Sequence, residues 1–158
     1  MSMEYPTYAR VKAGIRLAEQ RCRAQGTKLT HVRRQVLLYL LTHKRCVGAY
    51  EILHALRKDH PNIAPPTVYR PLQFLVSMGL VRHVLSANGY VFSAPDHVQT
   101  PDLLMVCSQC AVVVEVVDNN LHNQISGHLA QRGFVPDGCT VEVSTVCQHC
   151  RLTEVTAD

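Results

Sequence analysis

Two Cys-x-x-Cys pairs constrain this chain of 158 residues more than any other feature. The first pair runs from Cys107 to Cys110 and the second from Cys147 to Cys150, with 36 residues between them. Two residues between cysteines let one tight turn direct both sulfurs at a single ion, and two such turns provide the four thiolates that tetrahedral zinc prefers. A thioredoxin-like redox motif would use one pair, and two disulfides would need an oxidising compartment. The spacing therefore predicts a structural zinc site formed by Cys107, Cys110, Cys147 and Cys150.

The number of cysteines and the first residues of the chain indicate a reducing compartment. The chain has seven cysteines, an odd number, and its opening residues, MSMEYPTYARVK, contain no apolar stretch of the signal-peptide kind. Its longest strongly apolar run, Val36–Leu41, is much too short to cross a bilayer. We therefore expect a cytoplasmic protein without a membrane segment, whose cysteines bind metal rather than form a disulfide framework.

Charge divides the chain into two halves. Residues 1–92 hold 14 Lys and Arg against 4 Asp and Glu, a balance of +10, whereas residues 93–158 hold 2 against 8, a balance of −6. Concentrated positive charge is typical of a polyanion binder, and a solvated basic surface is the plainer alternative. The polar segment between the halves, Ser93–Asp102, contains two prolines. We predict domains at residues 1–92 and 103–158, joined by a hinge at residues 93–102.

The apolar residues of the basic half recur at helical spacing, which predicts four helices. Thr30 is placed to cap the second, and Pro65-Pro66-Thr67 opens the fourth. Pro71 is expected within or just past the first turn of the fourth helix, where its missing N–H costs little bonding. The expected spans are Tyr8–Arg23, Thr30–Leu41, Ala49–Lys58 and Val68–Met78.

A hairpin follows the fourth helix directly. The β-rich segments Leu80–Leu85 and Tyr90–Phe92 are joined through Ser86–Gly89, whose Asn-Gly dipeptide is a strong hairpin signal. Helices followed by such a hairpin form a winged helix, in which the last helix enters the DNA major groove and its first residues reach base edges.

This placement nominates the residues that contact DNA. Arg70 is suited to bidentate pairing with guanine, and Tyr69 to a thymine methyl or a phosphate. The alternative is that Tyr69 completes the core and Arg70 meets only solvent. The predicted contacts at the start of the fourth helix are Thr67, Tyr69 and Arg70. The predicted phosphate contacts are Lys12, Arg16, Lys28, Arg33 and Arg34.

The acidic half alternates strands with a helix, so the fold class is expected to be α+β. Strands are predicted at Leu103–Val106, Val112–Val117 and Thr140–Val146, with a helix at Leu121–Arg132. About 65 residues make a small core, which four metal–sulfur bonds would stabilise. Valine-dense strands of this kind invite pairing with a partner chain, so we infer a symmetric homodimer whose two recognition helices read a palindrome.

These features together resemble the ferric uptake regulator family of bacterial metal-sensing repressors. The likeness rests on Pro66-Thr67-Val68-Tyr69-Arg70, the hairpin, and the first cysteine pair followed by Ala111–Glu115, and it spans essentially the whole chain. The tract before Cys107 lacks the histidine-rich run of the iron-sensing branch, and Pro-Pro-Thr-Val-Tyr-Arg is similar to the zinc uptake regulator branch. The resemblance implies a winged-helix domain that binds operator DNA, a dimerisation domain with structural zinc, a regulatory zinc site near the hinge, and repression of zinc-acquisition genes.

The resemblance also implies ligands for the regulatory zinc. The family takes them from the wing, the hinge and the carboxylate five residues after the first cysteine pair, which here are His83, His97 and Glu115. Cys46 aligns with a histidine that reaches the hinge site in iron-sensing relatives and is a further candidate. Asp102, His122 and Cys139 fall where some relatives place another metal site.

The chain departs from the zinc branch at two of these positions. It has Arg82 where the wing histidine stands and Ser93 where the hinge cysteine stands. A shift of one residue along a strand moves a side chain to the opposite face, so His83 can replace that histidine only if the local register has moved as well.

Two other functions remain as alternatives. An iron- or peroxide-sensing regulator of the same family would keep the architecture and change the signal. A zinc enzyme acting on nucleic acid would need an open coordination position and a general base, but a four-cysteine site is closed and the chain contains no H-x-E or H-E-x-x-H motif. We therefore expect a regulator and not an enzyme.

Overall fold

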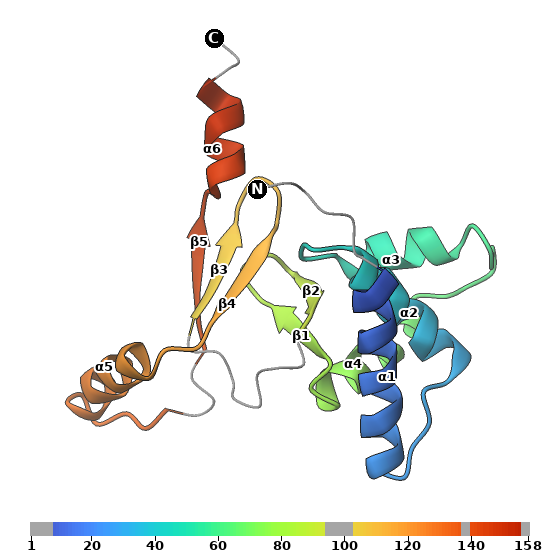
Figure 1. Ribbon diagram of the computed structural model, residues 1–158, viewed down its shortest axis with the longest axis horizontal. Helices are drawn as coiled ribbons and strands as arrows, with labels where there is room; N and C mark the ends of the chain where they lie inside the picture. Colours follow the sequence, from blue (N-terminus) through green and yellow to red (C-terminus); the bar gives the residue numbers. More distant parts are fainter. Residues whose placement is uncertain (1–7, 94–102, 137–139, 156–158) are drawn as a thin grey trace. The chain divides into compact units, whose positions relative to one another are not determined.

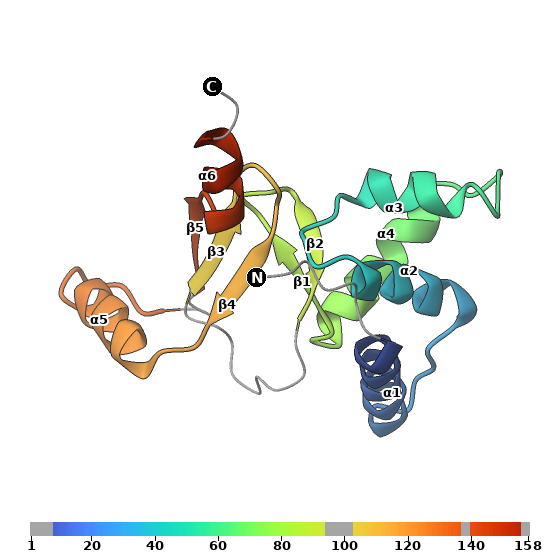
Figure 2. The ribbon, with the colours of Figure 1, turned by 45° about the horizontal axis from the view of Figure 1, so that its top comes forward.

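The computed structural model describes residues 8–93, 103–136 and 140–155 (Figures 1 and 2). The chain divides into two compact units, one within residues 1–95 and the other within residues 96–158. The fold is α+β, as predicted. Within the described residues, no helix is long and apolar enough to span a bilayer. Apart from Ser93, the hinge predicted at residues 93–102 lies outside the described residues.

The first unit contains the four predicted helices. They are α1 (Tyr8–Ala24), α2 (His31–Thr42), α3 (Ala49–Leu56) and α4 (Pro66–Ser77). The third ends two residues earlier than expected, at Leu56. The fourth runs through Pro71, which lies just past its first turn, as the sequence predicts.

The core of the first unit is built around α2, whose Leu37, Leu40 and Leu41 are fully buried. Burying a leucine side chain contributes about 1.5–3 kcal/mol, so these side chains fix how the helices pack. Close approach of α1 depends on Gly14, because a Cβ there would lie 2.4 Å from Cδ2 of Leu41. The first unit is therefore a packed helical domain that presents α4 on a rigid base.

The end of α4 is held by α1. Gly79 has a φ of +65°, which ends the helix, and Arg21 Nη1 donates to the main-chain oxygens of Met78 at 3.1 Å and Gly79 at 2.7 Å. A cation near the carboxyl end of a helix is favourable because the last carbonyls point toward it. Arg21 therefore fixes α4 relative to α1.

The predicted wing is present as β1 (Val81–Val84) and β2 (Gly89–Phe92), paired antiparallel with His83 opposite Tyr90. The turn between them ends at Asn88, whose φ is 44°, so β2 starts one residue earlier than expected. Val47, in the segment between α2 and α3, bridges the outer edge of β2 through two hydrogen bonds of 2.8 Å to Tyr90. The wing is thereby tied to the helical core.

The second unit contains a sheet whose described strands have the order β4-β3-β5. Strand β3 (Leu103–Cys107) pairs antiparallel with β4 (Val113–Val116) and parallel with β5 (Val141–Thr145). The parallel pairing requires a crossover, which α5 (Asn119–Ala130) provides. Asp118 caps α5 by accepting from the N–H groups of Asn120 and Leu121.

The second unit has a large exposed surface on α5 and on its sheet. Every residue of α5 is at least partly exposed, and in Figures 1 and 2 this helix, in orange, stands clear of both faces of the sheet. Val114 in β4 and Val143 in β5, the two strands on either side of β3, are exposed as well. A further helix, α6 (Gln148–Val155), follows β5 and was not predicted.

Candidate functional site

The two Cys-x-x-Cys pairs meet in the second unit. The Sγ atoms of Cys107, Cys110, Cys147 and Cys150 all lie within 4.8 Å of one another. Cys107 Sγ is 3.9 Å from Cys150 Sγ, and Cys110 Sγ is 3.7 Å from Cys147 Sγ. Sulfurs bound at about 2.3 Å around one tetrahedral zinc are about 3.8 Å apart, whereas disulfide sulfurs are about 2.05 Å apart. The spacing therefore fits a metal cage and not a pair of disulfides.

The local backbone explains how the cysteines converge. Ala111 has a φ of 58° and its N–H donates to the oxygen of Cys107 at 2.9 Å, which closes the tight turn between β3 and β4. The second pair spans the junction of β5 and α6, and the N–H of Cys147 donates to Cys107 Sγ at 3.4 Å. Because β3 and β5 are parallel neighbours, both pairs lie at the same end of the sheet.

The thiol pKa values in this cluster are spread widely. Burial raises the pKa of Cys107, but main-chain N–H groups of Cys110, Cys147 and Gln109 outweigh it and lower that pKa to about 6. Burial, together with the neighbouring sulfurs, raises the pKa of Cys150 to about 12. One thiolate therefore forms readily, whereas a full set of four requires a cation to offset its charge. This donor set fits zinc.

The residues expected to bind a regulatory zinc are not brought together by either unit. His83 lies in β1 and stacks on Tyr90, with ring centroids 4.7 Å apart. Glu115 lies in β4 of the other unit, and His97 lies outside the described residues. Among the described residues, the four-cysteine cluster is the metal-binding group that the structure contains. The regulatory set stays a prediction.

Cys46 and His83 lie on opposite faces of the wing. Val47, Tyr90 and His83 are directly opposite one another across the ladder, so their side chains share one face. Cys46 is one residue away from Val47, and its Sγ lies 2.6 Å from where a Cβ of Gly89 would be, on the other face. Cys46 is also buried, with 4% of its surface exposed. The wing therefore offers only one of the two to a single ion.

The further metal site predicted from Asp102, His122 and Cys139 is described only at one residue. His122 is exposed in the first turn of α5, where its N–H donates to the oxygen of Asp118 at 2.9 Å. Asp102 and Cys139 lie outside the described residues. This site also stays a prediction.

The side chains predicted to contact DNA at the start of α4 point outward. Tyr69 and Arg70 are exposed and Thr67 is half-buried. Tyr50, at the start of α3, was not predicted to belong here, yet it is 70% exposed and meets the ring of Tyr69 edge to face, with centroids 6.4 Å apart. Its position outside the buried face of α3, which Ala49, Ile52, Leu53 and Leu56 form, is the sequence signal that identifies it. Two exposed tyrosines in contact with each other therefore lie at the start of α3 and α4.

The five predicted phosphate contacts fall into two groups. Lys12, Arg16 and Lys28 are exposed, and Lys12 Nζ lies 5.9 Å from the centroid of the exposed Tyr8 ring. Arg33 and Arg34 have partners within the unit: Arg34 forms an ion pair of 2.6 Å with Glu19, and Arg33 lies over the ring of Phe74. The first group is exposed to a ligand, whereas the second links α2 to α1 and α4.

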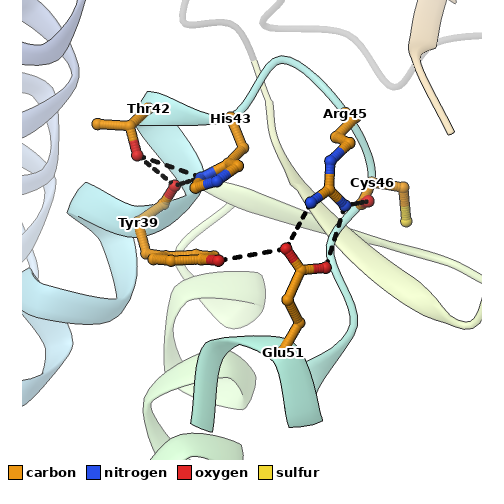
Figure 3. Close-up of polar contacts among 6 residues, drawn as sticks. All are labelled: Tyr39, Thr42, His43, Arg45, Cys46 and Glu51. Carbon is orange, nitrogen blue, oxygen red and sulfur yellow. Dashed lines mark hydrogen bonds and ion pairs between the residues drawn. The ribbon is translucent and has the colours of Figure 1, made fainter. Parts of the chain in front are cut away.

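A polar network fixes the segment that carries Cys46 (Figure 3). Arg45 binds both carboxylate oxygens of Glu51, with Nη1 3.0 Å from Oε2, and Tyr39 donates to Glu51 Oε1 at 3.2 Å. The hydrogen bonds from Arg45 hold the pKa of Glu51 below its ordinary value. The Cys46 side chain points away from Glu51 in Figure 3, and Arg45 Nη1 donates to the main-chain oxygen of Cys46 at 3.2 Å, so the network fixes the backbone at Cys46.

Comparison with known proteins gives consistent matches. Residues 24–144 match the Ferric uptake regulator family. The chain is 31% identical over 137 residues to the Zinc uptake regulation protein of Escherichia coli (strain K12), covering 84% of this chain and 78% of that protein. It is 26% identical over 134 residues to the Peroxide-responsive repressor PerR of Staphylococcus aureus (strain USA300), covering 82% and 86% of the two chains.

Two solved structures are similar over most of their length. A zinc uptake regulator complexed with zinc and DNA has a TM-score of 0.81 at 28% identity, and the match covers 92% of this chain and 97% of that one. Holo XcZur has a TM-score of 0.75 at 33% identity, with 89% and 98% covered. Since the family match extends over most of the chain and over parts of both units, this chain belongs to the Ferric uptake regulator family.

Proposed function

We propose that this chain is a zinc-responsive repressor: a homodimer that binds the operator DNA of zinc-uptake genes when a regulatory zinc is bound. The observation that carries the proposal is the likeness, over nearly the whole chain, to a zinc uptake regulator complexed with zinc and DNA. This chain also has a basic winged helix, which suits DNA, and a four-thiol cluster, which suits zinc.

In this proposal the four cysteines hold a structural zinc. Their burial and spacing support a closed site, which has no open position for a substrate. The second unit has a small core, whose buried apolar residues include Leu104 and Val106, so metal bonds supply much of its stability. The same unit carries the dimer contact, which α5 and the exposed valines of the sheet support.

The first unit reads DNA. Arg70 contacts a base edge, Tyr69 and Thr67 contact the backbone or a thymine methyl, and Lys12, Arg16 and Lys28 neutralise phosphates. Arg33 and Arg34 contribute by holding α2 in place, because their guanidinium groups already have partners. Base reading and phosphate contact are thereby assigned to different exposed side chains.

Regulation follows from a second zinc bound near the hinge by His97, Glu115 and one residue in the wing or in the segment that pairs with it. That residue is His83 or Cys46, because the two lie on opposite faces. Ligands drawn from both units are satisfied together only in some arrangements of the two units, so the ion shifts the population toward them. An arrangement that matches the spacing of the operator half-sites is favoured when zinc is present.

The proposal is tested by titrating the purified dimer into labelled operator DNA and scrambled DNA with zinc, iron or manganese. We expect zinc to give the tightest binding to operator DNA. Equal activation by iron would favour the iron-sensing alternative, and loss of binding on peroxide treatment would favour a peroxide sensor, which the likeness to PerR makes the alternative to include. Cys46→Ser and His83→Ala identify the wing ligand, because only one of them should abolish the zinc effect.

A further inference from the structure

We propose that a hollow beside the start of α4 holds one backbone phosphate of the bound DNA, and that His31 and His60 donate to it. The inference rests on the proposed DNA binding and adds a contact that neither the charge pattern nor the family resemblance nominated. The hollow has a volume of about 530 Å³. It is formed by the start of α2, the loop between α3 and α4, and Thr67 of α4.

The hollow is continuous with the surface that carries Arg70. A second hollow, of about 280 Å³, is lined by Arg70 together with Pro66 and Pro71 of α4. The two hollows share Val32 and Thr67, so they form one trough along the first turn of α4. A duplex that offers a base edge to Arg70 therefore brings its backbone close to the larger hollow.

Two histidines from different elements line the larger hollow. His31 opens α2 and His60 lies in the loop after α3, and both are exposed. The side-chain nitrogen of Gln35 lies 3.4 Å from Nε2 of His60. An amide nitrogen only donates, so Nε2 of His60 accepts and its ring N–H is on Nδ1. With Nε2 engaged by Gln35, the donor that His60 has for a ligand is the N–H on Nδ1.

The hollow also contains an opposing charge. Asp59 lines it, and its carboxylate repels an anion. The unit as a whole is strongly basic, with a balance of +10 over residues 1–92, so the surrounding field favours a phosphate although Asp59 weakens its binding. Asp59 and the two histidines should therefore have opposite effects on DNA binding. Removing the charge of Asp59 should strengthen binding, whereas removing the histidines should weaken it.

The phosphate contact would determine where α4 sits along the duplex. A phosphate contact carries no sequence information itself, but it fixes the register of the helix on the duplex. A phosphate held by His31 and His60, next to Thr67, would set which base pair Arg70 reads. Loss of this contact should therefore lower affinity for every sequence and also blur the base preference at the position of Arg70.

The test uses the zinc-loaded dimer and operator duplexes in which one phosphate at a time is replaced by an uncharged methylphosphonate. Wild type should lose affinity at several phosphates. The double variant His31→Ala/His60→Ala should bind the unmodified operator about 10-fold more weakly. At one phosphate in each half-site, the methylphosphonate should cost this variant nothing further. Asp59→Asn should bind the unmodified duplex more tightly than wild type, and this gain should vanish at the same phosphate.

The matched control is His54→Ala, because His54 is an exposed histidine of α3 that lines neither hollow. It should reproduce the wild-type profile. If the double variant kept wild-type affinity and lost affinity at the same phosphates as wild type, the proposed phosphate contact alone would be overturned. If zinc-loaded wild type did not bind operator DNA, the proposed function would be overturned, and the phosphate contact with it. If the double variant fails to fold, Asp59→Asn decides, since unchanged affinity at low salt would contradict the proposal.

Discussion

The guanidinium of Arg33 lies over the ring of Phe74, with 3.3 Å between Cζ and the ring centroid, and its Nη1 donates to the main-chain oxygen of Lys28 at 2.7 Å. This pair joins α2 to α4. A cation over an aromatic face contributes about 0.5–2 kcal/mol, depending on its desolvation. We expect Arg33→Ala to destabilise the protein by about 1 kcal/mol, measured as a lower melting temperature. Arg16→Ala, at an exposed arginine of α1, is the control and should leave the melting temperature unchanged. Equal melting temperatures for all three proteins would show that Arg33 is not structural.

Arg70 is expected to carry base reading. Arg70→Ala should weaken operator binding by about 1–3 kcal/mol and relax preference at one base position, because a bidentate guanine contact is lost. Arg16→Ala should instead weaken binding to all sequences similarly and reduce the slope of affinity against salt concentration by about 1. Fluorescence anisotropy on operator and scrambled duplexes at three salt concentrations separates the two. Unchanged affinity of Arg70→Ala for both duplexes would refute its assignment.

Removing one sulfur of the cluster should release the structural zinc. Cys110→Ser leaves three thiols around the ion, so we expect the variant to lose tightly bound zinc and to dissociate into monomers, measured by metal analysis and sedimentation. Cys22→Ala is the matched control, since Cys22 is a buried thiol of α1 in the other unit. It should keep its zinc and remain dimeric. A stable, zinc-loaded dimer of Cys110→Ser would contradict a four-cysteine site.

The ion pair of Arg45 and Glu51 should make α3 sensitive to acid. Because Arg45 lowers the pKa of Glu51, the pair stabilises the fold fully above about pH 4.5 and loses its effect as the pH falls through the lowered pKa. Both side chains are more than a third exposed, so screening limits the gain to about 0.2–1 kcal/mol. Glu51→Gln should therefore speed amide exchange in α3 more at pH 7 than at pH 3.5. An equal effect at both pH values would refute a role for its charge.

If one ion couples the two units to DNA, the coupling must be reciprocal. The factor by which zinc tightens DNA binding, typically about 5–150, must equal the factor by which operator DNA tightens binding of the regulatory zinc. Competition with a zinc chelator in the presence and absence of operator DNA measures the second factor. Scrambled DNA is the control and should change zinc affinity less than operator DNA does.

Local patterns predicted much of the fold and of the cysteine cluster. The helices of the first unit and the wing follow from apolar spacing and turn residues, which act over a few positions. The spacing within each cysteine pair predicted a shared ion. The parallel pairing of β3 and β5 brings the two pairs together. Helix α6 was missed because Gln148–Val155 is mostly polar, whereas α3, of equal length, has an apolar face.

What the sequence did not disclose depends on contacts between distant segments. Arg33 and Arg34 resemble any exposed basic pair until Phe74 and Glu19 are placed beside them. The opposite orientations of Cys46 and His83 depend on the bridge between Val47 and Tyr90, which joins segments more than 40 residues apart in the sequence. Such non-local pairings are set by the packed core and not by neighbouring residues.

The most direct measurement is operator affinity before and after mild chelation of the same dimer, with its zinc content determined at each step. The account predicts two classes of zinc, one that stays with the four cysteines and one that is removed. It further predicts that operator binding falls as the second class is lost and returns when zinc is restored. Operator affinity that stays unchanged after every exchangeable ion has been removed would contradict control of DNA binding by zinc.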